Sequence, residues 1–243
     1  MSNTHEQLLK QLEEQSKQKQ EQFLNHIADK LQRPRVMNRP SHPFRGAPAF
    51  WQQYELDEQE RLMQFTQNFE AAGGYVSKVQ SLQQASAFIT EKALEMKAKY
   101  VMRQDVSLLE QLGLEQELPQ LTVTRWNEDR EQDWKSRAAE TDIGVVLADY
   151  AVAHTGSIVL MSSKEKGRSV SLLPTLLVAI IPRSVVVTKL GEVLGKVDEM
   201  GREALPAGIH FVSGPSRSAD IENDLTIGVH GPGLVYAVIV DEL

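Results

Sequence analysis

The sequence contains no cysteine among its 243 residues. Disulfides, cysteine nucleophiles and cysteine-ligated zinc or iron–sulfur clusters all need that side chain, so each is excluded from this chain. Long apolar stretches are also absent. The longest run, Leu176 to Pro182, is far shorter than the roughly 20 residues that a membrane-spanning helix needs. Because the N-terminal residues are polar and lack a signal-peptide core, we expect a cytoplasmic protein without a membrane span.

An excess of positive charge is lacking as well. The chain carries 33 acidic and 26 basic residues, which gives a formal net charge of -7. Nucleic-acid binding depends on neutralising phosphates, and no cluster of Lys and Arg stands out, so we expect no nucleic-acid partner. The sequence motifs of P-loop nucleotide-binding proteins, zinc proteases and serine hydrolases are missing too. Metal binding has little support, because His154, His210 and His230 show no ligand spacing.

Residues 1–50 predict a helical and proline-rich arm. Apolar residues recur at helical spacing within residues 1–32, namely Leu8, Leu9, Leu12, Phe23, Leu24, Ile27 and Leu31. This narrow apolar stripe packs either on the main domain or on a partner. Prolines 34, 40, 43 and 48 then break regular structure. With Arg33, Arg35, Arg39 and Arg45 among them, this segment is either a solvated connector or an arm that meets an anionic surface on a neighbouring subunit.

Residues 51–243 predict an α/β domain. Helical patterns alternate with short apolar runs, such as 75–79, 100–102, 121–126 and 143–147. Further strands are expected at 158–161, 176–181, 185–187, 209–212 and 235–240, with a helix at 190–200. Because continuous apolar runs are typical of strands buried on both faces, we expect a mostly parallel open sheet flanked by helices.

Three clusters of small, hydroxyl and basic residues adjoin these strands. The first is the turn with Thr155 and Gly156, which either lets a backbone N–H approach a ligand or merely joins two strands. The second contains Arg168 and Ser171. Its guanidinium either holds a carboxylate or phosphate or lies on a solvated hairpin.

The third cluster runs from Ser213 to Glu222 and includes Gly214, Ser216 and Arg217. It follows the expected strand 209–212, and Ser216 or Ser218 is expected to cap a short helix there. A Gly-rich turn leading into a helix is a common anion site, although Asp220 and Glu222 would occupy the same positive field. His230, in the turn before the last strand, is either an acid, base or ligand or simply exposed.

Taken together, these segments resemble the lactate-utilization protein C family, a branch of the LUD domain. The matching stretches are Asp142-Ile143-Gly144, Ala148 to Ala153, Thr155 to Leu160, Arg168 to Pro174, Gly214 to Glu222 and Gly228-Val229-His230-Gly231-Pro232. One departure is His154, where the pattern leads us to expect an acidic residue. The resemblance covers residues 140 to the end densely and residues 55–140 only loosely.

The resemblance implies both a fold and a function. The fold would be similar to that of ribose-phosphate isomerases, CoA transferases and folate cyclo-ligases. The function would be that of an accessory subunit in the oxidation of L-lactate to pyruvate, working with two iron–sulfur proteins and compatible with a homo-oligomer. The alternative is a stand-alone enzyme acting on a small phosphorylated or carboxylated metabolite. Because the chain has no cysteine, the clusters would belong to the partners, and this chain would need no cofactor.

The resemblance brings no catalytic residues, so the catalytic set stays unknown. We instead expect one anion-binding pocket, built where loops at the carboxyl ends of neighbouring strands meet. Its ligand-binding residues would be Thr155, Gly156, Arg168, Ser171, Gly214, Ser216, Arg217 and His230. The rival interpretation is that Arg217 pairs with Asp220 or Glu222 and only fastens the end of a helix.

Overall fold

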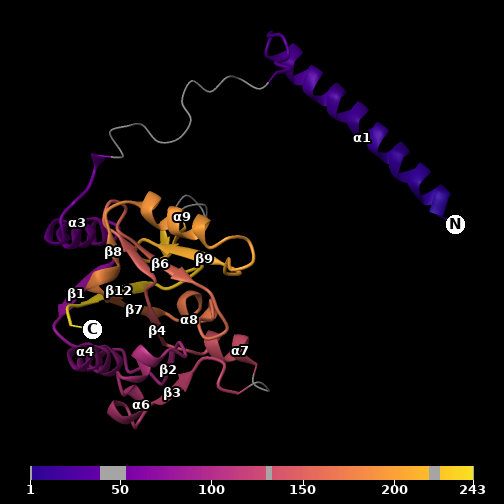
Figure 1. Ribbon diagram of the computed structural model, residues 1–243. Helices are drawn as coiled ribbons and strands as arrows, with labels where there is room; N and C mark the ends of the chain where they lie inside the picture. Colours follow the sequence, from indigo (N-terminus) through magenta and orange to yellow (C-terminus); the bar gives the residue numbers. More distant parts are fainter. Residues whose placement is uncertain (1, 39–52, 130–132, 219–224, 243) are drawn as a thin grey trace. The chain divides into compact units, whose positions relative to one another are not determined.

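The computed structural model describes residues 2–38, 53–129, 133–218 and 225–242 (Figure 1). The chain consists of two compact units, Met1–Gln52 and Gln53–Leu243. In the first unit, helix α1 spans Ser2–Lys30, so the expected N-terminal helix is confirmed. Its stripe of apolar side chains is largely exposed, with Leu12 at 52% and Phe23 at 64%. Arg39, Arg45 and prolines 40, 43 and 48 of the predicted connector lie outside the described residues.

The second unit is built on a six-stranded sheet in the order β1-β12-β7-β4-β2-β3. These strands span Tyr75–Val79, Leu234–Val240, Leu176–Pro182, Ile143–Leu147, Tyr100–Arg103 and Thr122–Arg125, in that order across the sheet. Every neighbouring pair is parallel. The predicted α/β class with a mostly parallel open sheet is therefore confirmed.

Both faces of this sheet are buried, as the continuous apolar runs predict. Along β7, Leu176, Val178 and Ile180 pack with α4 (Leu82–Glu95), α5 (Ser107–Glu110) and α6 (Leu114–Glu117). Residues 177, 179 and 181 pack on the other face with α3 (Glu58–Ala71), α7 (Trp134–Ala139) and α8 (Ser169–Leu172). Helix α3 begins at a capping box formed by Asp57 and Glu60, which fixes where it starts.

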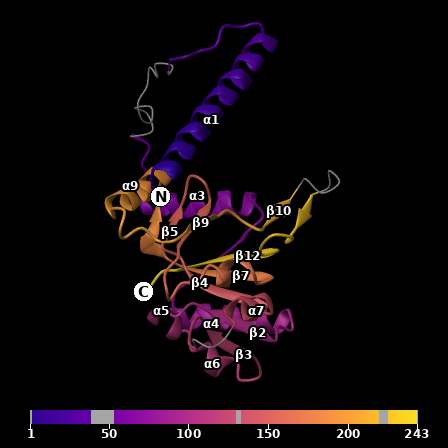
Figure 2. The same ribbon diagram turned by 90° about the vertical axis from the view of Figure 1, so that its right-hand side faces the viewer.

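A second sheet, which the sequence patterns did not separate from the first, covers part of the face on which residues 177, 179 and 181 lie. Its strands are β8 (Val186–Val187), β5 (Tyr150–Val152), β6 (Ser157–Met161) and β9 (Ile209–Val212), in this order. A 3-10 turn, η1 (Arg183–Val185), leads into β8. Helix α9 (Leu190–Glu199) packs on its outer side through Val193 and Val197. Figures 1 and 2 show the two sheets between α4 and α9, so the unit is layered helix, sheet, sheet and helix.

The expectation that a helix begins directly after Ser216 is wrong, whereas a helix capped by Ser218 would fall on residues 219–224, outside the described residues. Residues Arg217–Ser218 form strand β10, which pairs antiparallel with β11, Thr226–Ile227. The backbone N–H of Ser216 donates to Pro232 O, and its carbonyl accepts from Gly228 N. The bond from Gly228 thus occupies the carbonyl that an N-cap residue would use for the first helical hydrogen bond. Asp220 and Glu222 lie outside the described residues.

Candidate functional site

The parallel sheet has a topological switch point between β2 and β4. These two strands are neighbours, but the chain leaves β2 toward β3 on one side and leaves β4 toward β7 on the other. In open α/β sheets, ligands bind in the crevice outside the carboxyl ends of the strands at such a point. Gln104 directly follows β2, and Asp149 lies two residues beyond the end of β4. These two residues therefore lie where the fold is expected to bind a ligand.

Gln104 ties the ends of the two strands together. Its backbone N–H donates to Val145 O at 3.1 Å, and its side-chain Oε1 accepts from Leu147 N at 2.9 Å. The residue is only 2% exposed. Its Nε2 group donates no hydrogen bond to a described residue, and it is not among the buried atoms that lack a partner, so this end of the amide is open to solvent. Gln104 thus presents a rigidly placed amide donor at the switch point.

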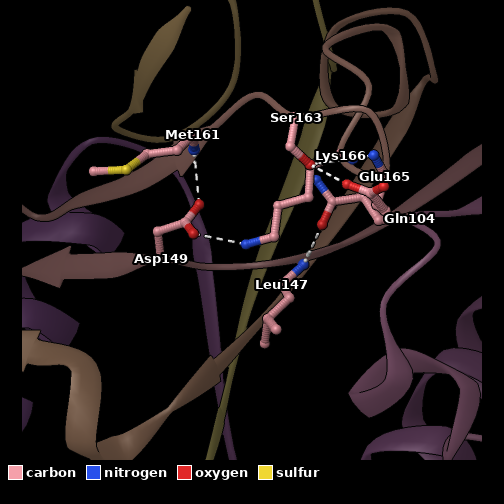
Figure 3. Close-up of polar contacts among 7 residues, drawn as sticks. All are labelled: Gln104, Leu147, Asp149, Met161, Ser163, Glu165 and Lys166. Atoms are coloured by element: carbon pink, nitrogen blue, oxygen red, sulfur yellow. Dashed lines mark hydrogen bonds and ion pairs between the residues drawn. The ribbon is translucent and has the colours of Figure 1, made fainter. Parts of the chain in front are cut away.

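Asp149 and Lys166 form an ion pair beside this amide, with 2.6 Å between Asp149 Oδ1 and Lys166 Nζ (Figure 3). The other carboxylate oxygen, Oδ2, accepts from the backbone N–H of Met161 at 2.7 Å. The exposed fractions of the two charged side chains are 17% for Lys166 and 20% for Asp149. Figure 3 shows the lysine side chain reaching toward Asp149 past Gln104 and Leu147.

The loop that carries Lys166, residues 162–167, is held in place over this edge of the sheet. Ser163 Oγ accepts from the backbone N–H groups of Glu165 and Lys166. The carbonyl of Glu165 accepts from Asp105 N at 3.0 Å. Its last residue, Gly167, lies against Trp126, because a Cβ there would come within 2.0 Å of the indole ring. The loop thus fixes the position of the ammonium group.

This cluster combines a cation, an amide donor and a carboxylate acceptor in one small, half-buried region. Such a combination can hold a small polar ligand through both kinds of hydrogen bond, and it can move a proton between a carboxylate and a neighbouring group. Within the described ranges, no group of three or more His, Asp or Glu residues is placed to hold a metal ion.

Two of the turns predicted to bind a ligand meet at the carboxyl end of α3. Ser157 Oγ lies 2.7 Å from Ser213 Oγ and donates to Thr155 Oγ1 at 2.8 Å. Asn68 Nδ2 donates to the carbonyls of Ala153 and His154 at 2.9 and 3.0 Å. The turn with Thr155 and the turn after β9 are therefore brought together, although Ser213 is 56 residues from Ser157.

Arg217 reaches this same helix end. Its Nη2 donates to the carbonyl of Ala72 at 2.6 Å, which satisfies one of the carbonyls that a helix leaves unpaired. Gly214 has a φ of +81°, and a Cβ there would lie 2.6 Å from the same carbonyl oxygen. The guanidinium thus fastens the end of α3, whereas its expected pairing with Asp220 or Glu222 involves residues outside the described ones.

Other predicted residues lie at the amino ends of strands rather than at the expected carboxyl ends. Ser216 bonds to the 228–232 turn that leads into β12, and His230 lies exposed in that turn. Ser171 lies in α8, just before β7, where its hydroxyl donates to Arg168 O at 3.0 Å. Crossover connections bring the chain back to the amino edge before each parallel strand, and these turns belong to such returns.

Arg168 lies apart from Thr155 and Gly156. Its side chain lies against Gly208, where a Cβ would be 3.1 Å from Arg168 Cδ. Gly208 bonds to Ser162, beyond the end of β6 opposite to Thr155 and Gly156. Five strand residues separate these ends, or about 13 Å at 3.3 Å per residue, so the three loops do not form one small pocket. Burial, with a smaller effect of the Arg168 charge, lowers the pKa of nearby His210.

Comparison with known proteins places this fold and these segments in one family. The LUD domain family matches residues 62–240, which is most of the chain. The chain belongs to the LUD domain family. The Lactate utilization protein C of Halalkalibacterium halodurans is 34% identical over 230 residues, covering 93% of this chain and 99% of that protein. The protein of the same name from Shouchella clausii is 33% identical over 223 residues, covering 90% and 96%.

A solved structure shares the fold of this LUD domain. A DUF162 family protein from Deinococcus radiodurans superposes with a TM-score of 0.56 over 76% of this chain and 99% of that one. Its sequence identity of 18% means that this likeness concerns the fold alone. The wider relationship to the isomerases, CoA transferases and cyclo-ligases stays a prediction. Across its described segments, the chain has no helix long and apolar enough to cross a membrane.

The sequence interpretation missed the switch-point cluster of this LUD domain. Gln104 and Asp149 each come just after an apolar run that was predicted as a strand. A polar residue directly after such a run was the available signal, and Asp149 even lies in a stretch that matched the family. Lys166 carried no such signal, because its segment looked like a solvated hairpin tip.

Proposed function

We propose that this LUD domain protein is an accessory subunit of L-lactate utilization. The observation that carries the proposal is its similarity, over nearly the whole length of both chains, to proteins named Lactate utilization protein C. Alignments that leave only a few per cent of the relative uncovered argue for the same domain composition, and thus for the same kind of role.

The proposed division of labour places electron transfer on two partner proteins. Oxidation of L-lactate to pyruvate releases two electrons, which iron–sulfur clusters can carry one at a time. Such clusters are held by Cys thiolates, and this sequence has none. The partners would therefore carry the clusters, and the present chain would supply binding or positioning within the cytoplasmic assembly.

Growth of a deletion strain tests the proposal. A strain of the source organism that lacks this gene should grow poorly on L-lactate and normally on pyruvate or glucose. A plasmid copy of the gene should restore growth on lactate. Normal growth of the deletion strain on L-lactate, in a cell without a second lactate dehydrogenase, would contradict the proposal.

A second candidate function is a stand-alone enzyme for a small phosphorylated or carboxylated metabolite. The half-buried Asp149–Lys166 pair at the topological switch point favours it, because charged groups at this place often do chemistry. Affinity purification of a tagged chain from lactate-grown cells separates the two candidates. Recovery of two iron-containing proteins in stoichiometric amounts supports the accessory subunit, and their absence favours the stand-alone enzyme.

A further inference from the structure

We propose that the switch-point cluster binds the carboxylate group of a small hydroxy or keto acid, with Lys166 and Gln104 as the donors. This inference rests on the proposed function, because it names the class of ligand that an accessory subunit of lactate utilization would hold. No comparison assigns a binding role to either residue.

The amide of Gln104 is oriented for this task by the fold. Its Oε1 accepts from Leu147 N at 2.9 Å, and only an oxygen can accept there, so the amide cannot be flipped. The Nε2 group is consequently the end that faces away from β4. Because this donor has no acceptor among the described residues and is open to solvent, an incoming carboxylate oxygen can accept from it without displacing a protein contact.

Lys166 supplies the charge. An ammonium group has three donors, and within the described part of the chain Lys166 Nζ contacts Asp149 Oδ1. The ion pair with Asp149 already holds the lysine side chain, so less side-chain freedom remains to be lost on binding. Lys166 can therefore bind an anion through its remaining donors while its ion pair with Asp149 stays intact.

The local charge favours a monoanion over a phosphate ester. Asp149 balances Lys166, and the adjacent Glu165 adds a negative charge. Hydrogen bonds from its own backbone N–H and from Ser163 hold the pKa of Glu165 below its ordinary value, so this charge persists at neutral pH. Glu165 repels any anion, and it repels a phosphate with two negative charges more strongly than a carboxylate with one.

Asp149 adds a preference for a hydroxyl group on the ligand. Each of its oxygens already accepts one hydrogen bond, from Lys166 and from Met161 N, and each retains a further lone pair. The 2-hydroxyl of L-lactate can donate to that carboxylate while its own carboxylate accepts from Lys166 and Gln104. We therefore expect L-lactate to bind more tightly than acetate, which lacks the hydroxyl.

Titration calorimetry with the purified full chain tests this inference. The probes are L-lactate, pyruvate, acetate and inorganic phosphate. L-lactate should bind saturably, and Lys166→Gln should weaken it by about 10- to 100-fold, the usual effect of losing a charge-assisted hydrogen bond. Gln104→Glu keeps an acceptor for Leu147 N but replaces the donor with a negative charge, so it should weaken binding at least as much.

Two matched variants act as controls. Lys164→Gln removes the same charge from the same loop at an exposed side chain, and it should change the affinity by less than about twofold. Lys166→Arg keeps the charge and should retain more affinity than Lys166→Gln, even if loss of the ion pair weakens folding. No saturable binding of L-lactate or pyruvate, tighter binding of phosphate, or unchanged affinity in Lys166→Gln would overturn the inference.

The binding experiment and the growth experiment can fail independently, so failure of the proposed site can be told apart from failure of the proposed function. A deletion strain that fails on L-lactate, combined with a pure chain that binds neither L-lactate nor pyruvate, refutes the site and leaves the accessory role intact. Binding that depends on Lys166, combined with normal growth of the deletion strain on L-lactate, supports the site and refutes the role.

Discussion

Replacing Gly156 with alanine should destabilise the second unit strongly. Two features of this position oppose a side chain. The backbone has a φ of +57°, in the left-handed region, and a Cβ would lie 2.5 Å from the backbone nitrogen of Phe69 and 2.6 Å from Asn68 C. Both opposing atoms belong to the backbone of α3, which is anchored by the fully buried Phe65 and Phe69.

The size of the effect follows from these two features. A left-handed conformation costs a non-glycine residue about 1–2 kcal/mol. Forcing a methyl group into packed backbone typically costs about 1–3 kcal/mol more, because the helix must move. We therefore expect Gly156→Ala to lower the free energy of unfolding by about 2–5 kcal/mol. At a urea dependence of about 2 kcal/mol per M, the midpoint would fall by about 1–2.5 M.

Urea unfolding followed by circular dichroism measures this change. Gly195→Ala in α9 is the matched control, because no atom lies within 4 Å of the added Cβ and the position is helical. It should stabilise the protein by about 0.5–1 kcal/mol. A loss below about 1 kcal/mol for Gly156→Ala would show that the close approach to α3 is not a constraint, and the reasoning would be wrong.

Three further outcomes are expected. Arg217→Ala should lower the free energy of unfolding by about 1 kcal/mol, since it removes the bond to Ala72 O; full stability with lost growth on lactate would instead show a ligand-binding role. The lowered pKa of His210 means that the fold favours its neutral form, so its contribution is present above the ordinary pKa of 6.5 and is lost as the pH falls through the folded value. The melting temperature should accordingly fall less between pH 7 and pH 5 in His210→Gln than in the unaltered protein. Equal falls would show that protonation of His210 does not contribute to the loss of stability. Finally, the purified chain should contain no iron–sulfur cluster by iron analysis and should not reduce an electron acceptor with L-lactate, because it has no cysteine; lactate-dependent reduction would contradict this.

Local patterns predicted most elements of the fold. The run 176–181 became β7, Leu176–Pro182, because a strand buried on both faces must be apolar along its whole length. The same logic did not reveal that β5, β6, β8 and β9 form a separate sheet. Which strands pair depends on contacts between distant residues, and a short apolar run does not encode its neighbour. A helix does not begin at Ser216 for a related reason, because the backbone of Ser216 forms hydrogen bonds with residues 228 and 232 instead.

The candidate site was harder to predict than the fold. Gln104 and Leu147 are 43 positions apart in the sequence, and they meet only because β2 lies beside β4. Glycine and arginine motifs drew attention to the turns with Thr155 and Arg217, whose described contacts largely hold α3 in place. Their binding of a ligand stays a prediction. A rule that weights polar residues directly after predicted parallel strands would have selected Gln104 and Asp149.

The position of β12 has a consequence for how the protein is made. This strand comes last in the sequence order of strands, yet it lies between β1 and β7, and Tyr75 of β1 pairs with Tyr236. During synthesis, β1 leaves the ribosome about 160 residues before β12, so its backbone edge has no strand to pair with until then. Sheet closure across so long a loop is intrinsically slow, and the growing chain is exposed to aggregation in the meantime. The strand order thus makes completion of the sheet a late event in synthesis, whatever the stability of the finished fold.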